Sequence, residues 1–239
     1  MDLSRRPFTV KGGGLDDFTI TCDALIVATG AKPKKLGLVG EKEPPAGMWG
    51  RGVTSCATCD GHFYRGEDVV VVGGGDTAME EATYLAKMVR KVYLIHRRDE
   101  FRASKIMIDR ARAAGNIELV VPWITEAILP DDDNNVRGVR LRHARSGEVR
   151  EIDVKGFFLG IGHEPNTEVF KGKLALDENG YIRIGEKAGA RGEAASATSV
   201  PGVFAAGDVA DHVYRQAVTA AGTGCQAAID AERFLANHD

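Results

Sequence analysis

The 239-residue sequence has little of what marks a membrane-bound or nucleic-acid-binding protein. No stretch approaches the ~18 consecutive apolar residues that a membrane-spanning helix requires. The net charge is only -3, and no block of basic residues offers a surface for nucleic acid or anionic lipid. The first residues lack the charged and apolar segments of a secretory signal. We therefore expect a cytoplasmic protein that acts on small molecules or other proteins, with no nucleic acid and no membrane among its partners.

Cysteine is scarce as well, since the chain has four cysteines and so no scaffold stapled by several disulfides. Cys56 and Cys59 stand three positions apart in "SCATCDGHFY", whereas Cys22 and Cys225 are isolated. A zinc site is disfavoured, because neither isolated cysteine has a histidine at ligand spacing beside it. Core packing is disfavoured, because small residues and turn formers surround the pair.

A redox-active dithiol is the interpretation of the pair that remains. Two cysteines three positions apart close a small ring, in which one thiolate attacks a disulfide and the second resolves the mixed disulfide. Asp60 follows Cys59 directly and could protonate a departing thiolate. It could equally be no more than the first residue of an Asp-Gly turn. The sequence leaves both roles of Asp60 open.

Hydrophobic and charged contents of 44% and 27% are ordinary for an α/β protein. The glycines at 12–14 lie between two β-like runs, "PFTV" and "FTITC", and predict a hairpin turn rather than a nucleotide loop. "ALIVATG" reads as a buried strand, and the Gly- and Pro-rich stretch 31–50 that follows it predicts a linker. Further along, a strand, a tight turn, an amphipathic helix and a second strand run from Asp68 to His96.

The tight turn after "DVVVV" carries a dinucleotide fingerprint. Gly73, Gly75 and Ala78 form G-x-G-x-x-A between a strand and a helix, the context that makes this motif specific. The first glycine permits the turn, the second lets backbone approach a pyrophosphate, and the small third residue lets helix and strand pack. The helix N-terminus adds unpaired N–H groups and a positive dipole. The predicted loop comprises Gly73, Gly74, Gly75, Asp76, Thr77 and Ala78.

The end of the next strand favours NADPH over NADH. An NAD site would place an acidic residue here for the ribose 2′-hydroxyl, but the chain reads "HRRDEFR" instead. Arg97, Arg98 and Arg102 can neutralise and fork onto a 2′-phosphate. Any single one of them could also be a solvated residue at a strand end. His96 belongs to the same predicted segment, but as lone histidines His62, His96 and His163 receive no catalytic role.

The rest of the chain contains a helix in "RASKIMIDRARAAG", a three-strand meander from Ile117 onward and a return strand in "GFFLGIGHEPNT". A strand in "VFAAGDV" and a helix over 215–237 close the chain. Asp208 sits in a loop at the end of that last strand, a position suited to a cofactor.

Two stretches closely resemble the low-molecular-weight bacterial thioredoxin reductases. They are "CATCDGHFYRGEDVVVVGGGDTAMEEATYLAKMVRKVYLIHRRDEFRASK" and "PGVFAAGDVADHVYRQAVTAAGTGCQAAIDAERFL". The resemblance implies two Rossmann-like nucleotide-binding α/β domains, an NADPH domain at 37–162 inserted into an FAD domain at 1–36 and 163–239. It also implies that electrons pass from NADPH to FAD, to the C-x-x-C disulfide and to thioredoxin, in a homodimer.

The resemblance assigns roles residue by residue. Cys56 and Cys59 are similar to the redox pair, and Asp60 to the proton donor of the reduced dithiol. The segments "VATG", "AAGDV" and "YRQA" resemble those that contact FAD. The residues so assigned are Thr29, Gly30, Gly207, Asp208, Arg215, Gln216 and Ala217.

One departure separates the chain from that pattern. The family opens with its own strand, G-x-G-x-x-G and helix, which hold the FAD pyrophosphate, whereas this sequence contains no second fingerprint. We therefore expect a truncated FAD domain with apolar edges that a partner or dimer covers. Two alternatives follow: an NADP-binding product without flavin or turnover, and a related flavin-dependent reductase with another protein acceptor or with ferredoxin as donor. The arginine cluster argues against ferredoxin.

Overall fold

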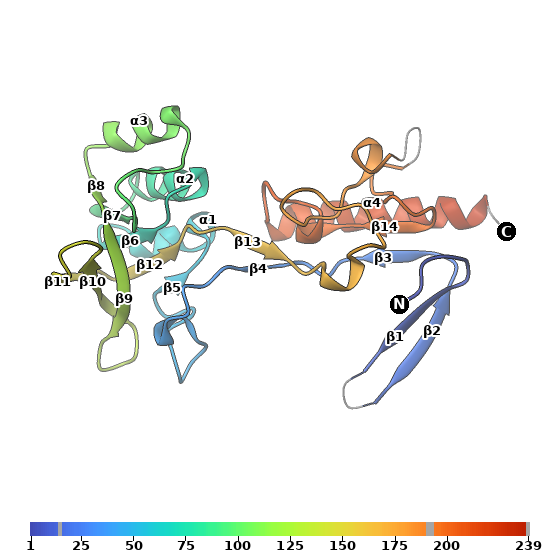
Figure 1. Cartoon of the computed structure of the whole chain (residues 1–239), viewed down its shortest axis with the longest axis horizontal. Coiled ribbons are helices and arrows are strands. Elements are labelled where there is room, and N and C mark those ends of the chain that lie inside the picture. The colour runs from blue at the N-terminus through green and yellow to red at the C-terminus, as the bar shows by residue number, and fades with distance from the viewer. Residues whose placement is uncertain (14–15, 190–193, 238–239) are drawn as a thin grey trace. The chain divides into compact units, whose positions relative to one another are not determined.

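The computed structural model describes residues 1–13, 16–189 and 194–237. The chain divides into two units, which Figure 1 shows in the colours of the sequence. Unit 1 combines Met1–Lys32 with His163–Asp239, and unit 2 is Pro33–Gly162. Unit 2 is therefore an insertion within unit 1. The sequence predicts these divisions at 36/37 and 162/163.

A five-stranded parallel sheet forms the centre of unit 2, with the order β5-β12-β6-β7-β8. Its strands are β5 (Val53–Thr54), β6 (Asp68–Val72), β7 (Lys91–Ile95), β8 (Ile117–Val120) and β12 (Gly156–Leu159). The four valines of β6 are buried on both faces, as a continuous apolar run in a parallel strand requires. This sheet confirms the α/β class with a Rossmann-type core.

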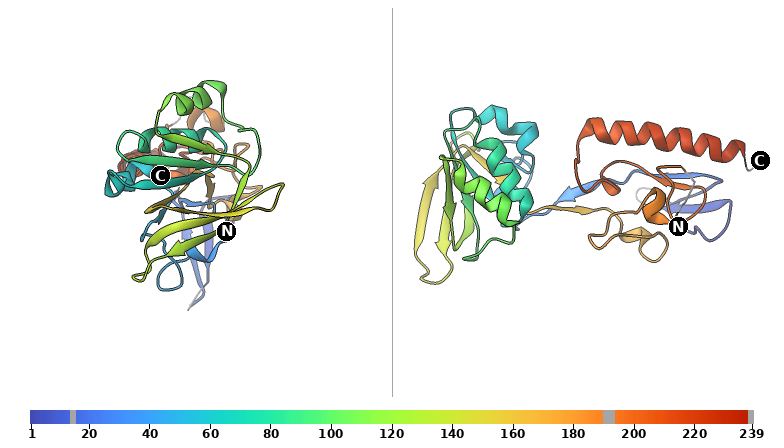
Figure 2. Two further views of the ribbon diagram at one scale, coloured as in Figure 1. Left: turned by 90° about the vertical axis from the view of Figure 1, so that its left-hand side faces the viewer. Right: turned by 90° about the horizontal axis from the view of Figure 1, so that it is seen from above.

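Two different layers cover the faces of that sheet. The helices α2 (Asp76–Leu85) and α3 (Lys105–Ala113) pack on the face to which Val69 and Val71 point. Val70 and Val72 pack on the other side against an antiparallel sheet of β9 (Trp123–Pro130), β10 (Val136–His143) and β11 (Val149–Asp153). The right-hand view of Figure 2 shows the antiparallel strands and the helices on opposite sides of the parallel sheet.

The structure differs from the predicted meander at its first strand. Residues 117–120 form β8 and join the parallel sheet beside β7, whereas the antiparallel sheet begins only at Trp123. Pro122 lies between the two strands and has no N–H to continue a ladder. Residue periodicity alone does not separate two strands of different sheets that are two residues apart.

Unit 1 contains a hairpin, a pair of parallel strands and one long helix. The hairpin pairs β1 (Phe8–Gly12) with β2 (Phe18–Cys22). Of the three glycines of the predicted turn, Gly12 ends β1, Gly13 follows it, and Gly14 lies outside the described residues. β3 (Leu25–Val27) pairs with β14 (Val203–Ala205), and β4 (Ala31–Pro33) pairs with β13 (His163–Pro165).

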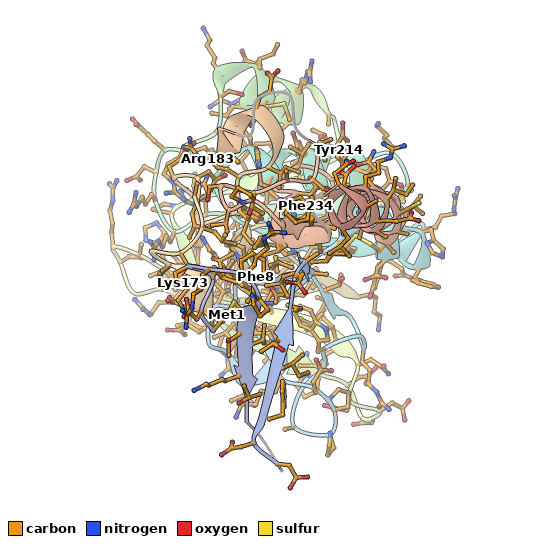
Figure 3. All side chains as sticks on the ribbon, turned by 90° about the vertical axis from the view of Figure 1, so that its right-hand side faces the viewer. Met1, Phe8, Lys173, Arg183, Tyr214 and Phe234 are labelled. Atoms are coloured by element: carbon orange, nitrogen blue, oxygen red, sulfur yellow. A yellow bond between two sulfur atoms is a disulfide. The ribbon has the colours of Figure 1, made fainter. Side chains whose placement is uncertain are left out.

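The long helix α4 (Ala217–Ala236) rests on the β3/β14 pair of unit 1. Ala227 and Ala231 bury their small side chains against Phe204, and Phe234 meets the same ring edge-on at 6.0 Å between centroids. Phe8 fills the separate core that lies around Val27 and Val203. Figure 3 labels Phe8 and Phe234 within unit 1. No helix formed by the described residues is long and apolar enough to cross a membrane.

The Gly- and Pro-rich stretch does more than connect the units, because part of it folds around a buried carboxylate. Glu41 ends a short 3-10 helix, Val39–Glu41, and is only 1% exposed. Its two carboxylate oxygens accept the backbone N–H groups of Leu36, Gly37 and Leu38, each at 2.8 Å. Three N–H donors compensate the loss of water around the charge. The stretch is thereby fixed to unit 2 from Leu36 onward.

We predict that Glu41→Ala destabilises unit 2 by about 3 kcal/mol, because three backbone N–H groups lose a charged acceptor. Urea unfolding followed by tryptophan fluorescence measures this selectively, since the chain's 2 tryptophans, Trp49 and Trp123, both belong to unit 2. The exposed neighbour Glu43 provides the matched control, Glu43→Ala, with little change expected. Equal losses in the two variants would contradict this account of the stretch.

Candidate active site

Four parallel strands of unit 2 end at one edge of the sheet. β5 leads into the cysteine pair, β6 into the glycine loop, β7 into the arginine-rich segment and β12 into Gly160. Because all four strands run the same way, their carboxyl ends and the loops that follow lie at the same edge. Ligands of open α/β sheets bind outside the carboxyl ends of the strands. The structure thus brings the dithiol and the dinucleotide fingerprint to one edge.

Cys56 and Cys59 form a disulfide with their Cα atoms 5.3 Å apart. Cys56 caps the short helix α1 (Ala57–Asp60), and its sulfur accepts the N–H of Cys59 at 3.2 Å. Cys59 is exposed, as a pair that exchanges with another disulfide requires and as a core cysteine is not. Cys22 and Cys225 are free thiols. No group of three or more His, Cys, Asp or Glu side chains in the described residues could hold a metal ion.

Asp60 is held by a neighbour that the sequence analysis missed. The Thr54 hydroxyl donates to Asp60 Oδ2 at 2.5 Å and accepts the N–H of Cys56 at 3.3 Å. The Asp60 N–H donates to the Cys56 carbonyl at 3.1 Å. Burial, assisted by the charge of Asp60, raises the pKa of Tyr64. Asp60 also precedes Gly61 at the start of a 3-10 helix, so its turn position and its side-chain contacts coexist.

The glycine loop is packed tightly at one end and open at the other. A Cβ on Gly73 would come within 2.3 Å of the Gly160 carbonyl oxygen, and one on Gly74 within 2.3 Å of the His96 ring. A Cβ on Gly75 would meet nothing within 4 Å. Gly75 caps α2, and in the described part of the chain the N–H groups of Gly75, Asp76 and Thr77 donate to no protein acceptor. Open space above free N–H groups at a helix N-terminus fits a pyrophosphate.

The arginine-rich segment folds back onto this loop. The Gly74 carbonyl accepts the backbone N–H groups of Arg102 and Ala103, at 2.7 and 3.1 Å. Arg102 is exposed, and so are Arg97 and Arg98. Their guanidinium groups form no ion pair with any described residue. Three unneutralised cations beside the free N–H groups fit a nucleotide that carries an extra phosphate.

His96 lies beneath the loop and contributes no charge to it. It is 7% exposed, stacks on Phe101 at 5.3 Å between centroids, and its Nε2 has no hydrogen-bond partner within the described structure. Burial and the positive charges of Arg102, Arg98 and Arg97 lower the pKa of His96, against a backbone hydrogen bond that raises it. His96 is therefore a neutral packing partner of Gly74.

The predicted FAD residues of unit 1 lie after its two parallel strands. Thr29 and Gly30 follow β3, where the Thr29 hydroxyl donates to the Asn166 carbonyl at 2.9 Å. The Asn166 side chain donates in turn to the Thr29 carbonyl at 2.8 Å. Gly30 has a φ of +68°, and a Cβ there would meet nothing within 4 Å. These contacts hold the β3 loop in shape while its glycine faces open space.

The loop after β14 presents a carboxylate. Gly207, with a φ of +74°, donates its N–H to the Thr223 hydroxyl at 3.0 Å and directs the chain into Asp208. Burial raises the pKa of Asp208, the charge of Asp211 adds to this, and Arg215 opposes it. No described residue donates a hydrogen bond to Asp208, so this half-buried carboxylate is an acceptor suited to a hydroxyl of a ligand.

Arg215, Gln216 and Ala217 form the entry to α4. The Asp211 carboxylate accepts the N–H groups of Val213, Tyr214 and Arg215 at 2.8 to 3.2 Å. The Arg215 side chain donates to the His212 carbonyl, and its backbone has a φ of +49°. Gln216 caps the helix, whose exposed first residue is Ala217. These hydrogen bonds fix the backbone that leads into the N-terminus of α4.

A disulfide and an open dinucleotide-binding loop at one sheet edge are the features of oxidoreductases that use a nicotinamide nucleotide to reduce a disulfide. The family model described as pyridine nucleotide-disulphide oxidoreductase matches residues 2–224. The chain is 51% identical over 237 residues to the thioredoxin reductase of Coxiella burnetii, covering 98% of this chain and 71% of that protein. A solved thioredoxin reductase from Giardia duodenalis superposes with a TM-score of 0.86 at 44% identity, covering 98% of this chain and 72% of that one.

The chain belongs to the pyridine nucleotide-disulphide oxidoreductases, and within them to the thioredoxin reductases. This confirms the resemblance stated from the sequence, the enzyme class, and FAD and NADPH as its cofactors. A relative from Pseudomonas fluorescens that is 51% identical over 238 residues carries a different name, glucosaminate ammonia-lyase. It covers 98% of this chain and 70% of that protein.

We predict that Gly73→Ala and Gly75→Ala fail in different ways. The first forces a Cβ against the Gly160 carbonyl and destabilises the sheet edge, whereas the second meets no protein atom and leaves the fold intact. Gly75→Ala nevertheless obstructs the approach of a pyrophosphate and weakens NADPH binding by about tenfold or more. Thermal unfolding and calorimetric titration with NADPH separate the two effects. Unchanged affinity in Gly75→Ala would contradict the placement of the phosphates.

Proposed function

We propose that this chain is a thioredoxin-disulfide reductase in which electrons pass from NADPH through FAD to the Cys56–Cys59 disulfide and on to thioredoxin. The observation that carries the proposal is the shared sheet edge, where the disulfide follows β5 and the open glycine loop follows β6, the two parallel strands on either side of β12. When bound, NADPH supplies a hydride and FAD carries its two electrons to the disulfide.

Unit 2 is the proposed NADPH-binding domain. The free N–H groups of Gly75, Asp76 and Thr77 hold the pyrophosphate, and Gly74 and Ala78 keep the loop close to the sheet. Arg97, Arg98, Arg102 and neutral His96 form the wall beside the adenosine, where the arginines fork onto the 2′-phosphate.

Unit 1 is the proposed FAD-binding domain. Thr29 and Gly30 border the adenosine side, and Gly207 and Asp208 hold the ribityl chain through the half-buried carboxylate. Arg215, Gln216 and Ala217 form the N-terminus of α4, whose dipole would favour negative charge on a flavin held there. The support is the placement of these loops after β3 and β14.

The disulfide carries the exchange with the protein substrate. One cysteine thiolate attacks the thioredoxin disulfide, and the other breaks the resulting mixed disulfide, so that Cys56 and Cys59 are oxidised as thioredoxin is reduced. In the opposite half of the cycle the Cys56–Cys59 bond accepts two electrons, and Asp60 supplies the proton to the departing sulfur. The support for this role is the pair of hydrogen bonds that hold Asp60 beside the cysteines, one from the Thr54 hydroxyl and one from its own N–H to the Cys56 carbonyl.

Thioredoxin as the protein substrate, a homodimer as the working unit and a cytoplasmic location complete the proposal. They rest on the resemblance to the thioredoxin reductases. An ammonia-lyase reaction is less well supported, because an elimination involves no net electron transfer and so requires neither a redox disulfide nor a site for NADPH. The two flavin-dependent alternatives, another acceptor and a ferredoxin donor, share the disulfide, but the unpaired arginines favour NADPH as donor.

Replacing Arg97 and Arg102 by alanine should weaken NADPH binding by at least about tenfold and leave NADH binding within about twofold, because only NADPH carries the 2′-phosphate. Calorimetric titration with each nucleotide measures both affinities. Arg183→Ala, an exposed arginine of unit 1, is the control. Equal losses for the two nucleotides would refute the assignment of the arginine cluster.

Cys56→Ser and Cys59→Ser should each abolish NADPH-dependent reduction of thioredoxin while leaving flavin reduction by NADPH intact, because only the later exchange needs both sulfurs. Stopped-flow absorbance of the flavin and a coupled insulin-reduction assay follow the two steps. Cys22→Ser and Cys225→Ser are matched controls, since both are free thiols. A purified chain without flavin absorbance and without turnover would reject the reductase function but not the dinucleotide site.

A further inference from the structure

Thr54 is a buried polar residue at the end of β5, just before the cysteine pair. It is the last residue of β5, pairs with Phe158 of β12, and is 7% exposed. Its backbone is thus fixed by the parallel sheet, and as a β-branched residue it has few side-chain conformations. The hydroxyl of Thr54 therefore has a nearly fixed position relative to the cysteine pair two residues further along.

The direction of its hydrogen bonds follows from chemistry. A hydroxyl has one hydrogen to donate, and an ionised carboxylate only accepts, so Thr54 donates to Asp60 Oδ2. Its lone pairs are then free for the Cys56 N–H, which can only donate. The hydroxyl connects the backbone of the first cysteine with the carboxylate that follows the second.

This arrangement leaves the two oxygens of Asp60 unequal. Oδ2 is engaged by Thr54, whereas no described residue donates a hydrogen bond to Oδ1. A proton carried by Asp60 is therefore carried on Oδ1, while the bond to Oδ2 prevents the carboxyl from rotating.

We infer that Thr54 is a positioning residue for proton transfer at the disulfide: it holds Oδ2 so that Oδ1 of Asp60 exchanges the proton with the cysteine sulfur. This rests on the proposed role of Asp60 and extends it to a residue that acts through the Asp60 carboxylate. Serine can perform the same task, and valine, which has nearly the same shape as threonine, cannot.

Reduction of the disulfide by dithiothreitol tests the inference without nucleotide or flavin. A thiolate of the reagent attacks one cysteine sulfur, the Cys56–Cys59 bond breaks, and the departing sulfur keeps the electron pair and takes the proton from Asp60. The second thiol of the reagent then closes its own ring, so the reagent is oxidised as the cysteines are reduced. Acid quenching, alkylation and mass measurement count the two new thiols beyond Cys22 and Cys225.

The experiment is a double-mutant cycle of Thr54→Val and Asp60→Asn. We expect Thr54→Val to slow reduction about fivefold, as the loss of one positioned hydrogen bond would, and Thr54→Ser to stay within about twofold of the unmodified chain. In the Asp60→Asn background, Thr54→Val should slow the reaction no further, because its effect passes through that carboxyl. Thr125→Val is the matched control, since Thr125 is also buried in unit 2 and its hydroxyl has no partner among the described residues.

Three outcomes of the Thr54 variants would overturn the inference. They are an unchanged rate in Thr54→Val, an equal slowing by Thr54→Val in both backgrounds, and a failure of Thr54→Ser to restore the rate. If Thr54→Val does not fold, Thr54→Ala takes its place in the cycle. An Asp60→Asn rate equal to that of the unmodified chain would overturn both this inference and the proton role of Asp60. The NADPH titrations and the thioredoxin assay test the proposed function separately, and each can fail while this cycle succeeds.

Discussion

The close approach of Gly73, Ala78 and Gly160 is the constraint on which the functional edge depends. β6, β12 and the start of α2 meet there, and a Cβ on Gly160 would come within 2.8 Å of the Ala78 Cα. Only residues with no side chain, or with a methyl group, let a helix begin directly against two strand ends. This packing aims the N-terminus of α2 along the sheet edge and leaves its first N–H groups without protein acceptors. The neighbouring strands then fix where the cysteines and arginines emerge.

Buried polar side chains fix segments of unit 2 that lie outside the regular hydrogen bonding of its helices and sheets. Glu41 attaches the incoming chain to unit 2 through three backbone N–H groups, and Thr54 attaches Asp60 to the end of β5. In both places one side chain forms hydrogen bonds with several polar groups of nearby segments. Helix and sheet hydrogen bonds do not pair these groups. Backbone groups in irregular segments need such partners when they are withdrawn from water. Unit 2 therefore combines a rigid sheet with loops that are individually fixed.

Much of the fold could be predicted because its signals are local. The four valines before Gly73, the spacing of Gly75 and Ala78, and the basic residues that stand directly after β7 are all visible in the sequence. The contacts of Glu41 and Thr54 could not be, since they depend on where loops without a periodic pattern turn. The division of residues 117–130 between two sheets was missed for a similar reason: the same alternation of side chains serves a parallel edge strand and an antiparallel one. The sequence indicates the candidate site residues, whereas the hydrogen bonds that orient their side chains depend on how the loops fold.

The burial of His96 bears on the proposed preference of the chain for NADPH over NADH. Burial and the nearby arginines lower the pKa of His96, so the positive charge at the proposed nucleotide site comes mainly from guanidinium groups, which stay protonated at every pH a cell reaches. A phosphate monoester, by contrast, changes its charge with a second pKa of ~6. At this edge the charges of the arginines are permanent, whereas the charge of a bound 2′-phosphate depends on pH.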